Sequence, residues 1–210
     1  MNKNTAIIVA TVVLIVSMVA FYSQMTQFSN PISPLKVGDS FTYHLTGIST
    51  SQNPVIQSPM GYSLSMYNQT DYWKFTITTV SGRTVSYNWV WRYINGTEKK
   101  GTDTVDLLSG KETAPMGFWL VYAPKLEVGD LLFPTGSYRY TVNQTDSRTY
   151  TDTTRESNFW FQKDNDFDLG FYFDKQTGVL ESLNCTVSYN NPKSVETLIW
   201  KLVNTNVWAV

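Results

Sequence analysis

The chain has 210 residues, with 16 basic and 17 acidic side chains and a formal net charge of −1. Neither sign forms a long block, which argues against a nucleic-acid partner and against a polybasic contact with lipid. Charged residues make up only 16% of the chain, so Ser, Thr, Asn and Gln must supply the polar surface, as suits an exported β-rich protein. The single cysteine, Cys185, excludes an internal disulfide, so packing alone must stabilise the fold.

The N-terminal region contains an uncharged apolar run over residues 6–22, preceded by Lys3. As a helix it would span roughly 25 Å, close to the thickness of a bilayer core of about 30 Å. The positive charge before the run places the N-terminus in the cytoplasm and the rest of the chain outside. The sequence therefore predicts a single-pass anchor over residues 1–23, through which the protein contacts the membrane, and a Pro-containing tether over residues 24–34.

A cleaved signal peptide is the alternative for this N-terminal run, because signals share its basic start and apolar centre. Such signals end in small residues at alternate positions, whereas Phe21 and Tyr22 are bulky. This favours a retained anchor, and both interpretations place residues 35–210 outside the cell as one domain.

The rest of the chain shows period-2 alternation with short polar turns, which predicts antiparallel strands. Aromatic residues reach 15%, a composition that fits strands better than helices. Residues 54–67 are expected to form a loop with one short strand, and Asn95-Gly96 a type I′ turn. The predicted strands are 40–46, 71–80, 83–94, 97–107, 118–122, 138–142, 148–153, 157–162, 170–174, 179–189 and 194–208, and the polar strand 97–107 is expected to lie near an edge or to face solvent. The predicted fold is mainly β: a single antiparallel domain, either a sandwich or a strongly curved open barrel, after the N-terminal transmembrane helix.

Several stretches carry a resemblance to other proteins. The motif L-x-V-G-D occurs at residues 35–39 and 126–130, which suggests an internal duplication. Together with VGDSFTY, RYINGTEKKGTDTVDLLSG and YFDKQTGVLESLN, the chain resembles uncharacterised exported archaeal surface proteins. This resemblance implies an archaeal envelope location and no activity. More distantly, a curved sheet behind an export segment is similar to LolA-like lipoprotein carriers.

Two groups of side chains are candidate binding sites. The tryptophans Trp89, Trp91, Trp119 and Trp160 can form core packing, line an apolar ligand cavity, or offer a flat face for sugar stacking. On the hairpin, Trp89, Trp91 and Tyr93 share one face, which is expected to point into the core. Asp164, Asp166 and Asp168 alternate like the start of a calcium loop, but Leu169 and Lys175 occupy the Gly and Glu positions of an EF-hand. Only a looser calcium site is compatible with them, and otherwise they form a solvated acidic loop.

The sequence also contains N-x-S/T sequons, which are acceptors for N-linked glycans. Asn68, Asn95 and Asn143 border turns or strand ends, where a glycan can attach. Asn184 lies within a predicted strand and is the least suitable of the sequons.

No motif indicates catalysis or a cofactor. His44 is the single histidine, which argues against a zinc site or a Ser-His-Asp triad. Paired carboxylates from distant strands would be needed for a hydrolase. The sequence therefore predicts a membrane-anchored extracytoplasmic binding or structural module of a cell envelope, with envelope or membrane proteins as its macromolecular partners. The alternative is a carrier or sensor of a lipid-like apolar ligand.

Overall fold

The computed structural model describes residue 17 and residues 33–51, 64–113, 118–150, 153–190 and 193–210. The chain divides into two compact units, Met1–Pro31 and Ile32–Val210. In the first unit only Ser17 is described, and it is helical. Within the described ranges, no helix is long and apolar enough to cross a membrane. The predicted anchor, apart from Ser17, and the tether, apart from residues 33 and 34, lie outside these ranges.

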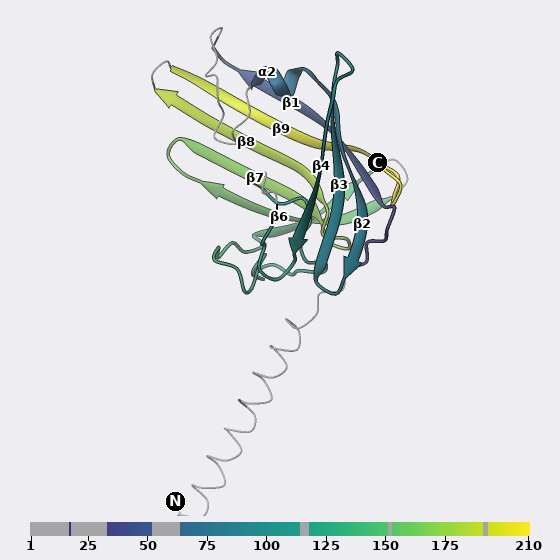
Figure 1. Ribbon diagram of the computed structural model, residues 1–210. Coiled ribbons are helices and arrows are strands. Elements are labelled where there is room, and N and C mark those ends of the chain that lie inside the picture. The colour runs from purple at the N-terminus through teal and green to yellow at the C-terminus, as the bar shows by residue number, and fades with distance from the viewer. Residues whose placement is uncertain (1–16, 18–32, 52–63, 114–117, 151–152, 191–192) are drawn as a thin grey trace, which may run out of the picture. The chain divides into compact units, whose positions relative to one another are not determined.

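Nine strands of the described chain form one antiparallel sheet, in the order β4-β3-β2-β1-β9-β8-β7-β6-β5 (Figure 1). Two meanders are joined where β1 pairs with β9, so β4 and β5 are left as the edges. A short helix, α2, precedes β2. The bounds are β1 Ser40–Ser49, α2 Leu64–Asn68, β2 Thr70–Ser81, β3 Thr84–Tyr93, β4 Glu98–Asp106, β5 Gln144–Thr149, β6 Thr154–Lys163, β7 Phe167–Asp174, β8 Leu180–Asn190 and β9 Lys193–Thr205.

The sheet is open and strongly curled at the end where β5 lies. Groups on strands that are not neighbours in the sheet meet each other. Tyr43 Oη of β1 donates to Leu180 O of β8 at 2.6 Å, past the intervening β9, and Arg148 Nη1 of β5 lies 3.3 Å from Glu181 Oε2 of β8. Trp208, after β9, packs against Phe41 of β1 at 5.8 Å and lies under Arg155 of β6 at 4.4 Å. The curl therefore brings strands from the two halves of the sheet together.

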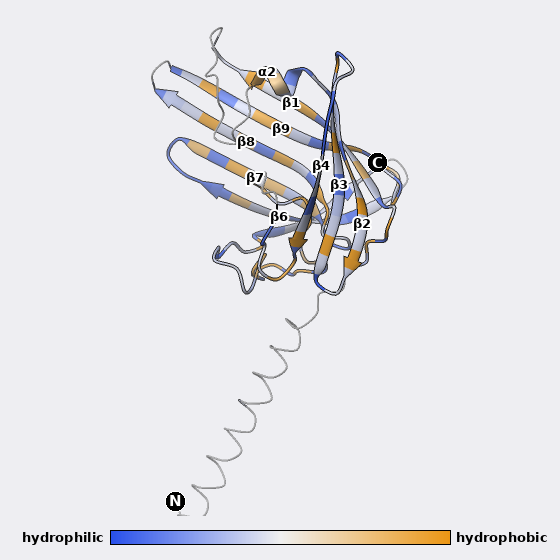
Figure 2. Ribbon diagram, in the orientation of Figure 1, coloured by the Kyte–Doolittle hydropathy of each residue, from blue (hydrophilic) through white to orange (hydrophobic). Residues whose placement is uncertain are grey.

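The core lies on one face of the sheet, which we call the inner face. Along β9, Leu198, Trp200 and Leu202 are buried while the intervening residues are not, and Figure 2 shows the same alternation of apolar and polar residues along the strands. Trp200 contacts Trp73 of β2 at 5.2 Å, and the two rings form a T-shaped pair. Burying each large aromatic ring contributes on the order of 2 kcal/mol or more, which fixes the strand register.

The connection between β4 and β5, residues 107–143, covers the inner face. Phe118 packs edge-on against Trp200 at 4.9 Å, and Tyr122 stacks on Phe173 at 4.3 Å. The backbone N–H of Tyr122 donates to Gly178 O at 2.9 Å, which holds this segment against the start of β8. In the described part of the chain, the inner face is thus filled by the protein's own aromatic side chains.

Three local expectations from the sequence are corrected. Residues 118–122 and 138–142 are not strands, because each makes only an isolated bridge, to Val179 and Leu131 respectively. Residues 64–67 belong to helix α2 and not to a short strand; residues 54–63 of that predicted loop lie outside the described ranges. The turn at Asn95-Gly96 is not type I′, since only Gly96 has a positive φ, of 83°. It is a three-residue loop, which the Gly96 conformation and the bond from Tyr93 N to Thr97 O at 2.9 Å define.

Both copies of the L-x-V-G-D motif fold into the same turn. In each, the Asp carboxylate accepts a hydrogen bond of 2.8 Å from the backbone N–H three residues earlier. The glycines have φ values of 93° and 92°, which favour residues without a side chain. Each glycine N–H also donates at 2.9 Å to a residue of the returning segment, Ile77 in one copy and Val142 in the other. The two copies of the motif therefore share a turn structure as well as a sequence.

Candidate functional site

An aromatic cleft lies between the β4–β5 connection and the inner face at β6 and β7. Its volume is about 300 Å³. Trp119 and Tyr138 come from the connection, and Trp160 comes from β6, so the cleft joins segments that are distant in sequence. The residues that line it are Gly110, Glu112, Phe118, Trp119, Tyr138, Tyr140, Trp160, Leu169 and Phe171.

The rings of the cleft are held in fixed mutual orientations. Tyr138 and Tyr140 stack at 5.3 Å with an interplanar angle of 10°, and Tyr140 packs against Trp160 at 4.4 Å. Trp119 stands edge-on to Tyr138 at 5.7 Å. Tyr138 is 54% exposed, so the cleft opens to solvent on its side. The rings offer apolar surfaces in two directions, which suits a flat ligand with an apolar face.

Trp119 is anchored by one hydrogen bond and one close packing contact. Its indole N–H donates to Gly110 O at 2.7 Å, and its ring packs on Phe133 at 4.6 Å. Gly110 has a φ of 67°, and a Cβ at this position would lie 2.8 Å from the Phe133 ring. The glycine is thus required by both its backbone conformation and the packing beneath it.

The cleft also carries a carboxyl group, that of Glu112. Burial, and secondarily the nearby Asp103, raise the pKa of Glu112 to about 8. At neutral pH its carboxyl group is therefore mostly protonated and can both donate and accept a hydrogen bond. The carboxylate of Asp103 is used in other hydrogen bonds, because it accepts one from Tyr87 Oη at 3.2 Å and one from Thr113 Oγ1 at 2.6 Å.

Polar groups on the cleft rings are also available to a ligand. Within the described part of the chain, the Tyr138 and Tyr140 hydroxyls and the Trp160 indole N–H make no hydrogen bond. Together with Glu112 they place donors and acceptors among apolar rings. This combination of apolar faces and polar tips matches the surface of a sugar.

The four tryptophans predicted from the sequence divide into two groups. Trp119 and Trp160 meet in the cleft. Trp91 is buried in the core, where its indole N–H donates to Thr70 Oγ1 at 2.7 Å. Trp89 is partly buried and lies flat over Gly101 of β4, where a Cβ would be 2.4 Å from its ring. The expected inward orientation of this β3 face is confirmed for Trp91, and Trp89 and Tyr93 pack against the same core.

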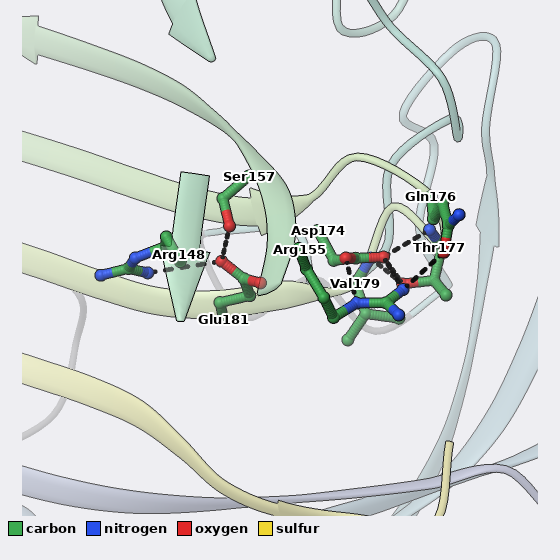
Figure 3. A network of polar contacts seen from close by, with 8 residues as sticks. All are labelled: Arg148, Arg155, Ser157, Asp174, Gln176, Thr177, Val179 and Glu181. Atoms are coloured by element: carbon green, nitrogen blue, oxygen red, sulfur yellow. Dashed lines mark hydrogen bonds and ion pairs between the residues drawn. The ribbon is translucent and has the colours of Figure 1, made fainter. Parts of the chain in front are cut away.

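A second polar site, at the curled end of the sheet, is a network of buried charges (Figure 3). Arg155 holds Asp174 through two hydrogen bonds of 2.7 and 2.9 Å, and Asp174 is fully buried. Ser157 and Arg148 both donate to Glu181 Oε2. Burial raises the pKa of Glu181, and its hydrogen bond with Ser157 opposes this shift. These pairs link β5 and β6 to β7 and β8, so their role is to stabilise the curl.

The acidic residues proposed for a calcium site lie at the exposed turn between β6 and β7, with Asp164 and Asp166 in the turn and Asp168 at the start of β7. Asp164 accepts a hydrogen bond from Asn165 N at 2.8 Å, and Asp168 lies 3.4 Å from Lys163 Nζ. Asp166 shares this exposed turn. In the residues described, no group of three or more His, Cys, Asp or Glu side chains is placed to hold a metal ion. The calcium site remains a prediction from sequence, and this turn adds no support to it.

The predicted glycosylation sites differ in how their side chains are used. Asn68 donates to Gly47 O and accepts from Gly47 N, each at 2.9 Å, so its amide is part of the fold. Asn143 accepts from Phe161 N at 2.9 Å. Asn95 is exposed in its turn and accepts from Thr97 N at 3.0 Å, a bond that leaves its own N–H₂ group outward. Of these three, Asn95 has the geometry best suited to a glycan.

Glu112, Tyr138 and Tyr140 are the cleft residues that the sequence did not single out. No local signal marks them, since Glu112 follows an edge strand and the tyrosines lie in an irregular connection. Their roles depend on contacts with β6 and β7, which are far along the chain.

In comparisons with known proteins, no family model, no curated protein and no solved structure matches this chain.

Proposed function

We propose that the protein is an extracytoplasmic binding module that holds a sugar-like ring ligand in the aromatic cleft. The observation that carries this proposal is the meeting of Trp119, Tyr138, Tyr140 and Trp160 around the protonated carboxyl group of Glu112. Sugars have apolar C–H faces and a rim of hydroxyls, and these match stacked rings with polar tips.

The size and the surroundings of the cleft favour this ligand class over a lipid. A volume of about 300 Å³ lies at the lower end of the range for small-molecule sites, about 300–1,000 Å³. An acyl chain would need a deep apolar cavity, whereas the 107–143 connection fills the inner face with Phe118 and Tyr122. The lipid-carrier alternative therefore has less support than the ring-binding module.

The chemistry of the cleft supports binding without hydrolysis. Glycoside hydrolysis requires a pair of carboxyl groups on either side of the bond that is cleaved. Glu112 is the one carboxyl group among the described lining residues, and Asp103 behind it is 3% exposed.

The location belongs to the same proposal. The apolar run at residues 6–22 would anchor the chain with its N-terminus in the cytoplasm and the sheet outside, in a cell envelope such as that implied by the resemblance to archaeal surface proteins. Protease added to intact cells should then degrade the residues beyond Ser23. Complete protection of the sheet domain would refute this topology.

Ligand binding is tested by titrating the full chain, in detergent, with short oligomers of glucose, mannose and N-acetylglucosamine while recording tryptophan fluorescence. We expect at least one oligomer to bind, and Trp119→Ala to weaken it about tenfold through the loss of one stacking face. Trp89→Ala is the matched control, because Trp89 is also a partly buried tryptophan but does not line the cleft. Binding that is unaffected by Trp119→Ala, or no binding by any oligomer, would refute the proposed ligand class.

A further inference from the structure

The outer face of the sheet carries a second aromatic groove, over strands β6 to β9. Its volume is about 480 Å³. Phe159 and Phe161 lie parallel at 5.8 Å with an interplanar angle of 8°, and Phe159 stacks on Tyr172 at 4.4 Å. Phe161 is 47% exposed, which is unusual for a ring of this size on a sheet face turned to solvent.

The floor of this groove is one cross-strand row, in which Phe161 pairs with Gly170, Gly170 with Asn184, and Asn184 with Ile199. Gly170 has no side chain, and a Cβ there would lie 3.2 Å from the Phe159 ring. Phe161 and Asn184 are two strands apart, which is about 10 Å. The Phe159 ring therefore lies against Gly170, and the Phe159 and Phe161 rings together form an aromatic wall that faces Asn184 across the groove.

Asn184 is the acceptor of the sequon Asn184-Cys185-Thr186. Its side chain is exposed, and it makes no hydrogen bond to any residue that the structure describes. Cys185 points to the inner face and is buried, so the middle residue of the sequon does not obstruct the outer face. The position judged least suitable from sequence thus has an exposed amide in the same groove as the aromatic rings.

We propose that Asn184 carries an N-linked glycan whose first sugar lies in this groove and stacks against Phe161 and Phe159. The donor is a polyprenyl-phosphate-linked oligosaccharide of the export pathway. Asn184 Nδ2 bonds to C1 of the sugar, the C1–O bond to phosphate breaks, the lipid phosphate leaves with the electron pair, and the amide releases one proton. Transfer precedes folding, because in the finished sheet β8 is paired with strands on both sides. The inference rests on the proposed extracytoplasmic location and is independent of ligand binding in the cleft.

Occupancy is tested by expressing the full chain in a eukaryotic secretory host, releasing glycans with peptide-N-glycosidase in ¹⁸O water, and mapping peptides by mass spectrometry. We expect the ¹⁸O-labelled Asp at position 184, and its absence in Thr186→Val, which keeps the β-branched shape but destroys the sequon. A glycan on Asn95, which is exposed in its turn, would show that the chain reaches the oligosaccharide transferase of the host. Glycan at Asn95 without glycan at Asn184 overturns this inference alone; glycan at neither overturns it together with the proposed export.

Stacking is tested by a double-mutant cycle on the glycosylated protein. Asn184→Gln removes the glycan and should lower Tm by about 2–4 °C, which corresponds to about 1 kcal/mol for a domain of this size. In a Phe161→Ser background the same change should have no effect. Removal of the glycan at Asn95 by Asn95→Gln is the control and should not be coupled to Phe161. Equal effects of Asn184→Gln in both backgrounds would show that the glycan does not stack on the groove.

Discussion

The raised pKa of Glu112 makes the stability of the domain depend on pH in a defined way. In the unfolded chain this carboxyl group has a pKa near 4.5, and in the folded protein its pKa is about 8. Between these values the native state holds a proton that the unfolded state has released, so the free energy of unfolding falls as pH rises through this window. The stabilisation is complete below about pH 4.5 and is lost above about pH 8.

The magnitude follows from the size of this pKa difference. Each pKa unit corresponds to about 1.4 kcal/mol, which gives an upper bound of about 5 kcal/mol for the full window. Glu112 is only partly buried and lines an open cleft, so solvent relaxation reduces the effect, and about 2–3 kcal/mol is the expected loss. Glu112→Gln keeps the shape and cannot ionise, so its stability should not show this loss.

The measurement is urea unfolding of both proteins, followed by tryptophan fluorescence at several pH values from about 5 to about 9. As pH rises through the window, the free energy of unfolding of the wild type should fall relative to that of Glu112→Gln. Other titrating groups are common to both proteins and cancel in the comparison. Glu156→Gln makes the same chemical change at an exposed side chain and should not reproduce the effect. Parallel pH profiles of wild type and Glu112→Gln would refute the argument.

Three further substitutions test the packing of the sheet domain. Trp91→Ala should lower the free energy of unfolding by about 3–5 kcal/mol, measured in urea, because the ring is 3% exposed; an unchanged midpoint would place the ring outside the core. Arg155→Met leaves the buried carboxylate of Asp174 without its cation and should cost about 3–5 kcal/mol, which thermal unfolding would detect as a lower Tm. Gly178→Ala puts a Cβ 2.1 Å from Tyr122 O and should be far more destabilising than Gly82→Ala, which meets no atom within 4 Å; equal Tm losses would contradict this.

Local features of the chain were predictable because they depend on neighbours in sequence. Alternation over residues 71–80 and 83–94 predicts β2 and β3 with their buried faces, since successive side chains of a strand point to opposite sides. The polar residues 97–107 predict a strand that lies near an edge or faces solvent, and β4 is an edge of the sheet. Turn glycines such as Gly82 and Gly178 have the positive φ that their contexts require.

The apolar run 118–122 shows where such reasoning reaches its limit. Its composition suits a buried strand equally well as a buried irregular segment, since both remove apolar side chains from water. The run belongs to the connection that packs on the inner face, and its backbone bonds to residues 178–180 near the start of β8. The turns of the L-x-V-G-D repeat, in contrast, depend on local interactions. In each turn the Asp carboxylate accepts a hydrogen bond from the backbone three residues earlier, and the Gly has a positive φ.

From its sequence alone, the protein is determined to be mainly β, with an N-terminal apolar run, aromatic strand faces and turns at defined glycines. Only the tertiary structure decides that β1 pairs with β9, that Arg148 reaches Glu181 across two strands, and that Trp119 and Trp160 line one cleft while Trp89 and Trp91 pack with the core. It also decides that Asn184 lies beside Phe161 across a glycine. The physical reason is that a period of two assigns a side chain to a face, whereas the partner strand and the curvature are set by long-range burial that no local pattern encodes.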